Sequence, residues 1–168
     1  MKQILYQFYS RIVNLIHWFP LIWNYRNWDY TDILNILKFK ILQHQRCAED
    51  NNLCPSAHRD SQRMMTCCKL IDRIQSEWYL TEHFDYCTFT IASTPYNNNG
   101  KLMSLQKCVA EENFKTYFSK YPNLHDNVKK QWGKEDEDIA VKMGIINHSR
   151  AKHLLFKILE ENIEKWWY

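Results

Sequence analysis

Glycine is scarce in this chain of 168 residues. Only Gly100, Gly133 and Gly144 occur, and they lie far apart in the sequence. A phosphate-binding loop needs grouped glycines, because its backbone must approach the phosphate closely. The sequence therefore contains no glycine-rich loop for a nucleotide, and we expect no cofactor of that class.

A long uninterrupted apolar run is also missing. Residues 1–23 are rich in large apolar side chains, but Gln7, Arg11, Asn14 and His17 are among the polar residues that interrupt them. No segment reaches the ~20 apolar residues of a membrane span, nor does it have the uninterrupted apolar centre of a signal peptide. The residues Ile4, Phe8, Ile12, Leu15 and Phe19 instead recur with a helical period. We expect a helix packed on the core and ending near Pro20, with docking on a membrane surface as the minor alternative.

The cysteines are consistent with a reducing compartment. They number six, but a chain of this length does not require disulfides to fold. Without a secretory signal, reduced and mostly buried thiols are expected. We therefore predict a cytoplasmic protein with no membrane partner.

Charge and aromatic content narrow the choice of function. The 22 basic and 19 acidic residues leave a net charge of +3, which does not by itself indicate nucleic acid. Aromatic residues make up 15% of the chain, so the core or a binding surface must be rich in aromatic rings. The sequence cannot tell which of these rings are exposed.

Residues 30–79 form the central stretch of the chain. Their apolar residues predict two amphipathic helices. Asp29, Thr31 and Asp32 can cap the first helix, and an Asn-rich turn with Pro55 separates it from the second. Two helices with a short connection are expected to be antiparallel neighbours.

The other segments complete a mainly all-α prediction. We expect one helical domain over 1–168, with an N-terminal helix and aromatic linker (1–28), the helical hairpin (30–79) and C-terminal helices (101–168). Residues 81–100 alternate briefly and contain an Asn-Gly turn, which predicts a loop with at most a minor hairpin. The spacing of Leu102, Leu105 and Val109 predicts a helix, and Asn147–Ser149 is expected to break the last helical stretch.

Basic residues of the second hairpin helix form the main candidate binding site. Arg59, Arg63, Lys69 and Arg73 fall largely on the side opposite its apolar stripe. Guanidinium and ammonium groups in a row can bind phosphates, and Trp23 or Trp28 could stack on bases. The alternative for the basic residues is an ordinary solvated helix face. The alternative for the two tryptophans is packing over the core.

Three further clusters carry weaker hypotheses. His44, Cys47, Cys54 and His58 supply zinc-type ligands, but their spacing does not match a zinc finger, so we predict no metal site. Residues 82–85 (Glu-His-Phe-Asp) contain groups used by metal-dependent nucleases, yet four consecutive residues rarely converge. The acidic run 135–138 fits a solvated helix start, or a mimic of a phosphate track on another protein. We therefore expect no enzyme, with a metal-dependent nuclease as the minor alternative.

A family resemblance rests on the hairpin and the C-terminal helix. The residues that carry it are Tyr30, Leu37-Lys38-Phe39-Lys40, Ser56, Arg59, Met64, Leu70, Ile74, Tyr79, Ala151-Lys152-His153-Leu154-Leu155-Phe156 and Ile163-Glu164-Lys165-Trp166-Trp167. Over the central hairpin and the C-terminal helix, roughly half of the chain, the sequence resembles a group of small proteins of tailed bacteriophages. That family has no established activity. The resemblance implies a viral origin and a bacterial host cell.

Two classes of function follow from these observations. The first is a non-enzymatic accessory protein that binds a host protein or ribonucleoprotein, with a defence nuclease of the CRISPR type as the expected target. The second is a small RNA- or DNA-binding module that uses the basic helix and aromatic stacking. The sequence does not predict the oligomeric state.

Overall fold

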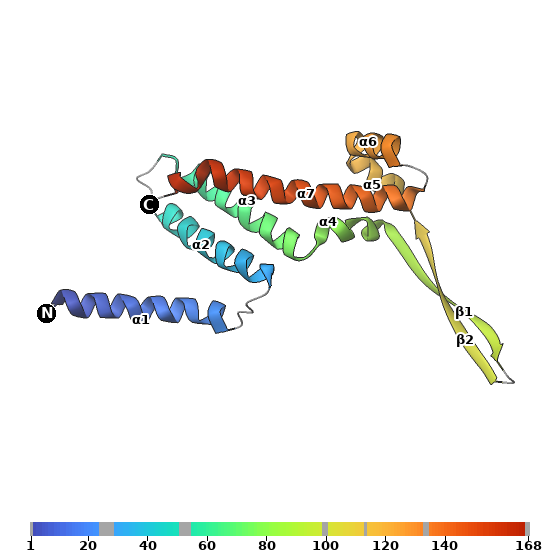
Figure 1. Cartoon of the computed structure of the whole chain (residues 1–168), viewed down its shortest axis with the longest axis horizontal. Coiled ribbons are helices and arrows are strands. Elements are labelled where there is room, and N and C mark those ends of the chain that lie inside the picture. Colours follow the sequence, from blue (N-terminus) through green and yellow to red (C-terminus); the bar gives the residue numbers. More distant parts are fainter. Residues whose placement is uncertain are drawn as a thin grey trace. The chain divides into compact units, whose positions relative to one another are not determined.

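The fold of the chain is mainly helical, as the sequence predicts (Figure 1). A computed structural model describes residues 2–23, 29–50, 55–98, 101–112, 114–132 and 135–166. The α-helices are α1 (Lys2–Trp23), α2 (Tyr30–Asp50), α3 (Ala57–Gln75), α4 (Trp78–Thr81), α5 (Phe114–Lys120), α6 (Pro122–Trp132) and α7 (Asp136–Asn162). The remaining elements are the 3₁₀ helices η1 (Glu82–Tyr86) and η2 (Ile163–Lys165), and the strands β1 (Cys87–Asn98) and β2 (Lys101–Glu112).

Contacts within the chain divide it into two compact units. Unit 1 consists of Met1–Gln75 and Lys157–Tyr168, and unit 2 of Ser76–Phe156. Helix α7 contributes residues to both. The single domain expected from the chain length stays a prediction, and the two units are described separately below.

Helices α2 and α3 of unit 1 form the predicted antiparallel pair. Three polar contacts show the antiparallel order, because the α2 residue numbers rise while the α3 numbers fall. They pair Asn35 with Gln75, Lys38 with Asp72, and Gln45 with Ser61. At the start of α2, the Asp29 carboxylate accepts a hydrogen bond from the Thr31 backbone at 2.9 Å, as expected for an N-cap. The predicted turn lies partly in residues 51–54, outside the described residues.

The face between α2 and α3 is tightly packed. Met64, Cys67, Ile71 and Ile74 of α3 are almost completely buried, at the spacing that the sequence predicts. Burial, aided by the neighbouring Cys68, raises the pKa of the Cys67 thiol to about 11. These two cysteines are free thiols that behave as small core residues.

Within unit 1, the last residue of α7 makes a polar contact with α3. The Arg63 guanidinium of α3 donates a hydrogen bond of 2.8 Å to the side-chain oxygen of Asn162, which is itself buried. This contact fixes the point at which η2 begins. The predicted break at Asn147–Ser149 is wrong, because α7 continues through it. Polar residues are tolerated inside a helix when tertiary contacts outweigh their lower propensity.

Residues 87–112 of unit 2 form a β-hairpin, which is longer than the minor hairpin that the sequence predicts. Strands β1 and β2 pair antiparallel from Cys87 with Glu112 to Asn98 with Lys101. The helix predicted through Leu102, Leu105 and Val109 is therefore wrong for residues 101–112. Leu105 and Val109 are four residues apart, a spacing that fits both a helix face and one face of a strand, so this pair could not decide between the two.

Unit 2 has its own aromatic core. It is built from the first half of α7 together with α5 and α6. The buried members are Phe114, Tyr117, Phe118, Leu124, Val128, Ile139, Ala140 and Met143. The rings of Tyr117 and Tyr121 are 5.7 Å apart and nearly perpendicular, a favourable edge-to-face arrangement. Part of the high aromatic content therefore serves ordinary core packing.

A close approach of α7 to α4 yields a first prediction. A methyl group added at Gly144 would lie 2.9 Å from the backbone oxygen of Tyr79, and backbone cannot easily move away. Gly144→Ala gains about 1 kcal/mol of helix propensity but loses more from overpacking of about 1–3 kcal/mol. We expect a net loss of stability in urea unfolding. Ser149→Ala, at an exposed position of the same helix, should change stability by less than about 0.5 kcal/mol. Equal stability of both variants would contradict the close approach.

Candidate binding surfaces and polar centre

Helix α1 exposes an unusually large apolar surface. Its large side chains range from 42% exposed at Ile12 to 73% at Trp23. The exposed members are Ile4, Leu5, Tyr6, Phe8, Tyr9, Ile12, Leu15, Ile16, Phe19, Ile22 and Trp23. At 1.5 Å per residue the helix is about 33 Å long, and exposed apolar side chains recur along all of it.

The exposed residues lie on one side of α1. With about 100° of rotation per residue, they span an arc of about 200°, called here the apolar face of α1. Gln3, Gln7, Ser10, Asn14 and His17 occupy the opposite arc together with Trp18. The helix contains no acidic residue. It is therefore strongly amphipathic, with its apolar side turned to solvent.

The contact of α1 with α2 is made from the polar arc. The Trp18 ring lies 5.0 Å from the Phe39 ring, and the Lys40 ammonium lies 4.9 Å from the centre of the Trp18 ring. The latter is a cation–π contact. Because Trp18 holds the helix by its polar side, the apolar face of α1 stays uncovered.

The prediction that residues 1–23 pack their apolar side on the core is wrong. The helical period itself is confirmed, and the helix continues past Pro20 to Trp23. Trp23 is exposed, whereas Trp28 lies outside the described residues. Among the helices that the structure describes, none is long and apolar enough to span a membrane.

The basic residues of α3 divide into two groups. Arg59, Lys69 and Arg73 are exposed and lie within an arc of about 80° on the helix. This set is called the basic face of α3. Arg59 also lies 3.8 Å from the buried carboxylate of Asp60, which reduces its positive potential. The basic face is thus present but partly neutralised.

Arg63 has a different role from the one predicted. Its guanidinium contacts Asp60 at 3.4 Å and Asn162 at 2.8 Å. A guanidinium has five N–H donors, so these contacts leave some available in principle. Its position nevertheless makes it a link between α3 and α7, and its part in nucleic-acid binding stays a prediction.

The zinc-type residues are not gathered at one point in the part of the chain that the structure describes. His44 and Cys47 lie on α2 and His58 on α3, where its Nε2 is 3.0 Å from the amide nitrogen of Gln62. Cys54 lies outside the described residues. Within those residues, no three His, Cys, Asp or Glu side chains form a group that could hold a metal ion.

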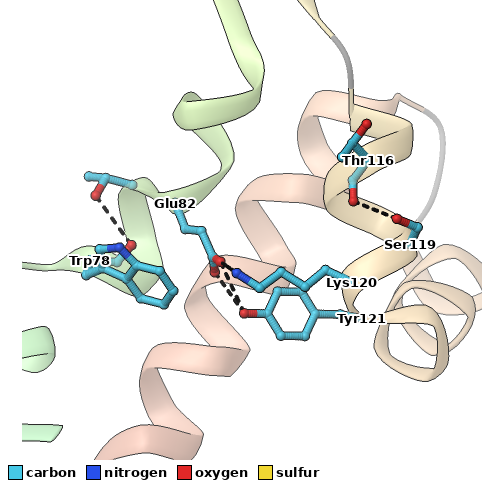
Figure 2. Close-up of polar contacts among 7 residues, drawn as sticks. Trp78, Glu82, Thr116, Ser119, Lys120 and Tyr121 are labelled. Atoms are coloured by element: carbon cyan, nitrogen blue, oxygen red, sulfur yellow. Dashed lines mark hydrogen bonds and ion pairs between the residues drawn. The ribbon is translucent and has the colours of Figure 1, made fainter. Parts of the chain in front are cut away.

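A buried carboxylate forms the polar centre of unit 2 (Figure 2). Glu82 is only 2% exposed. It forms an ion pair with Lys120 and accepts a 2.9 Å hydrogen bond from the Tyr121 hydroxyl. The Lys120 ammonium also lies 5.2 Å from the Trp78 ring centre. This charge is paired and hydrogen-bonded, as a buried carboxylate must be.

The neighbours of Glu82 share its low-polarity surroundings. Burial, followed by the Glu82 charge, raises the pKa of Tyr117 to about 12, although the neighbouring Asn147 side chain opposes the shift. His83 is 3% exposed, and neither ring nitrogen has a hydrogen-bond partner of normal geometry within the described residues. Burial lowers the pKa of His83, while the Glu137 carboxylate and the Leu80 backbone act in the opposite direction. His83 is therefore neutral at pH 7.

This arrangement does not assemble residues 82–85 into a nuclease site. Glu82 and His83 point into unit 2, whereas Asp85 is exposed. A substrate phosphate cannot reach the buried pair in this conformation. The acidic run behaves as predicted at a helix start: Asp136, Glu137 and Asp138 are exposed in the first turn of α7, where carboxylates favour the helix dipole.

Comparisons with known proteins give no identification. No protein-family model, curated protein or solved structure matches this chain.

The buried His83 gives a pH prediction. Its pKa is lower in the folded protein than the ~6.5 of an unfolded chain. As pH falls below that value, the unfolded state binds a proton that the native state does not, so the free energy of unfolding falls. We expect His83→Phe to reduce the loss of stability between pH 7.5 and pH 5, measured by urea unfolding at each pH.

A matched control separates this effect from general acid sensitivity. His153 is exposed on α7, so His153→Gln should leave the slope unchanged. His148, whose pKa is also lowered by burial, should account for part of the remaining slope. An unchanged slope in His83→Phe would show that His83 is not shielded from solvent.

Proposed function

We propose that this chain is a non-enzymatic accessory protein that binds a host protein or ribonucleoprotein through the apolar face of α1. The observation that carries the proposal is the exposure of this face over the whole length of the helix. Leaving so many apolar side chains in water is unfavourable, at roughly 25 cal/mol for each Å². Covering them with a partner recovers that free energy.

The chemistry of the face suits a protein partner. Tyr6, Phe8, Tyr9, Phe19 and Trp23 supply aromatic rings, the side chains most often found at the energetic centres of interfaces. The rings of Phe19 and Trp23 already contact each other, with centres 5.0 Å apart. An amphipathic helix that presents such anchors can occupy an apolar groove of another protein.

The more specific proposal is an inhibitor of a bacterial defence nuclease of the CRISPR type, acting in the host cytoplasm. The resemblance to small phage proteins supports a bacterial host cell as the place of action. The exposed acidic start of α7 supplies, in addition, a negative surface that could mimic a phosphate track. Neither observation identifies the nuclease.

Truncating two anchors tests the α1 interface. We expect Phe8→Ala with Phe19→Ala to weaken binding more than tenfold, because each truncated anchor costs about 2 kcal/mol. Binding is measured by recovery of host proteins on the tagged full chain from nuclease-treated lysate, and then with the purified partner. Both residues are exposed, so the melting temperature should not fall.

The control changes the opposite arc of the same helix. Gln7→Ala with Asn14→Ala should bind like the unchanged protein. Equal binding by the Phe8 and Phe19 variant would contradict the proposal. Binding of α1 to lipid vesicles with no protein partner recovered would also contradict it, in favour of a membrane surface. Relief of CRISPR interference in cells, abolished in the same variant, is the expected result for the inhibitor.

RNA or DNA binding is the second candidate, and the basic face of α3 favours it. Lys69 and Arg73 are exposed one turn apart on the same arc of the helix. Trp23 is also exposed and could stack on bases. The partial neutralisation of Arg59 and the internal contacts of Arg63 make this candidate the weaker one.

Salt dependence decides whether the second candidate holds. Lys69→Gln with Arg73→Gln should weaken binding of a single-stranded RNA and reduce the slope of log affinity against log salt by about 1 for each phosphate that is no longer bound. Fluorescence anisotropy at several salt concentrations measures both the affinity and the slope. Binding that is unchanged by these substitutions would exclude the basic face of α3.

A further inference from the structure

A small pocket in unit 1 lies apart from the apolar face of α1. Its volume is about 250 Å³, and it is lined by Leu37, Lys40, Ile41, His44, Ile163 and Trp166. The pocket therefore fits a small molecule or one side chain, rather than a peptide segment.

One side of the pocket is a single stripe of α2. Leu37, Lys40, Ile41 and His44 are spaced by three and four residues, so they share one helix face. Ile41 is buried at the base of this stripe. The apolar and the nitrogen-bearing side chains thus lie side by side along the same helix.

The other side comes from the end of the chain. Ile163 belongs to η2, and Trp166 follows it. The hydrogen bond between Arg63 and Asn162 fixes the residue that precedes η2. Trp166 is 3% exposed, and its Nε1 has no hydrogen-bond partner within the described residues. A polar hydrogen is therefore buried next to an apolar pocket.

The lining of the pocket contains nitrogen-bearing side chains and no acidic one. Lys40 and His44 are the only lining residues with ionisable side chains, and no carboxylate is among the six. The Lys40 ammonium donates one 3.0 Å hydrogen bond to Gln43. An ammonium has three donors, so it can also bind an anion. The pocket is thus complementary to a ligand with an apolar body and a negative end.

We propose that this pocket binds a small amphipathic carboxylate. Leu37, Ile41, Ile163 and Trp166 surround its apolar part, while Lys40 and His44 bind the carboxylate. The proposed ligand does not contact the apolar face of α1, although Lys40 also contacts the Trp18 ring on the polar side of that helix. The pocket gives the C-terminal segment a ligand-binding role in addition to its packing on α2.

The test compares three ligands of equal chain length with the full-length protein. Hexanoate, hexanol and hexylamine differ only in the group at one end. Binding is followed by the indole N–H signal of Trp166 in ¹H–¹⁵N spectra, which a Trp166→Phe variant assigns. We expect a saturable shift with hexanoate, roughly fivefold weaker binding of hexanol, and still weaker binding of hexylamine. A fivefold difference is what one exposed ion pair between Lys40 and the carboxylate contributes.

Variants then assign the two ends of the ligand. Lys40→Gln should weaken hexanoate binding about fivefold without affecting hexanol, whereas Lys40→Arg should retain hexanoate. Lys130→Gln, at an exposed lysine of α6, is the matched control and should bind normally. Ile163→Trp should fill the pocket and abolish binding of all three ligands without lowering the melting temperature, because Ile163 is half exposed.

Three results would overturn the proposal. The first is the absence of a saturable Trp166 shift within the solubility of hexanoate. The second is equal affinity for hexanol and hexanoate, which would show that charge has no part. The third is a shift of the Trp18 or Trp23 signals with Trp166 unchanged, which would place the ligand on α1 instead.

Discussion

The buried face of α3 is the constraint on which unit 1 depends. Met64, Cys67, Ile71 and Ile74 are excluded from water, and such apolar burial offsets the entropy of ordering the chain. The same helix also fixes the end of α7 through Arg63 and Asn162. One helix therefore determines both the packing of the hairpin and the position of η2 beside α2.

Unit 2 depends on a different balance. Tyr121 packs against its aromatic core and donates a hydrogen bond to the buried Glu82 carboxylate. Lys120, the ion-pair partner of Glu82, is the last residue of α5, and Tyr121 follows it. Removing one partner would leave a buried charge without compensation, which is costly. The position of α5 is therefore specified by a polar contact as well as by ring packing. His83 shows the cost of such burial, because its ring nitrogens lose water without gaining normal partners among the described residues.

The sequence predicts the parts of this fold in which a period and a burial pattern agree. The α3 stripe belongs to this class, because its periodic residues Met64, Cys67, Ile71 and Ile74 are also buried. In the α2 stripe Leu34 and Ile41 are buried, whereas the prediction for Ile33 is wrong, because its side chain is exposed. The sequence-based prediction is wrong where one spacing fits both a helix and a strand, as with Leu105 and Val109 in β2. It also fails for α1, whose helical period is real although its apolar side is uncovered. Periodicity gives the face that a helix prefers to bury, and the available partner surfaces decide whether it is buried.

The candidate sites follow the same division. Lys69 and Arg73 are exposed as a solvated or phosphate-binding face requires, but the role of Arg63 depends on Asn162, which is 99 residues away in the sequence. The pocket beside Trp166 could not be predicted for the same reason, since α2 and η2 meet only in the folded chain. Local spacing places a side chain on a helix face, whereas its partners depend on tertiary packing.

The uncovered side of α1 has a consequence for the life of the protein in a cell. Chaperones and proteases recognise exposed apolar segments, which normally mark unfolded chains. A folded molecule that displays such a segment is subject to the same surveillance until a partner covers it. On the proposed function, the abundance of this protein should follow the abundance of its partner, and copies made in excess should be removed.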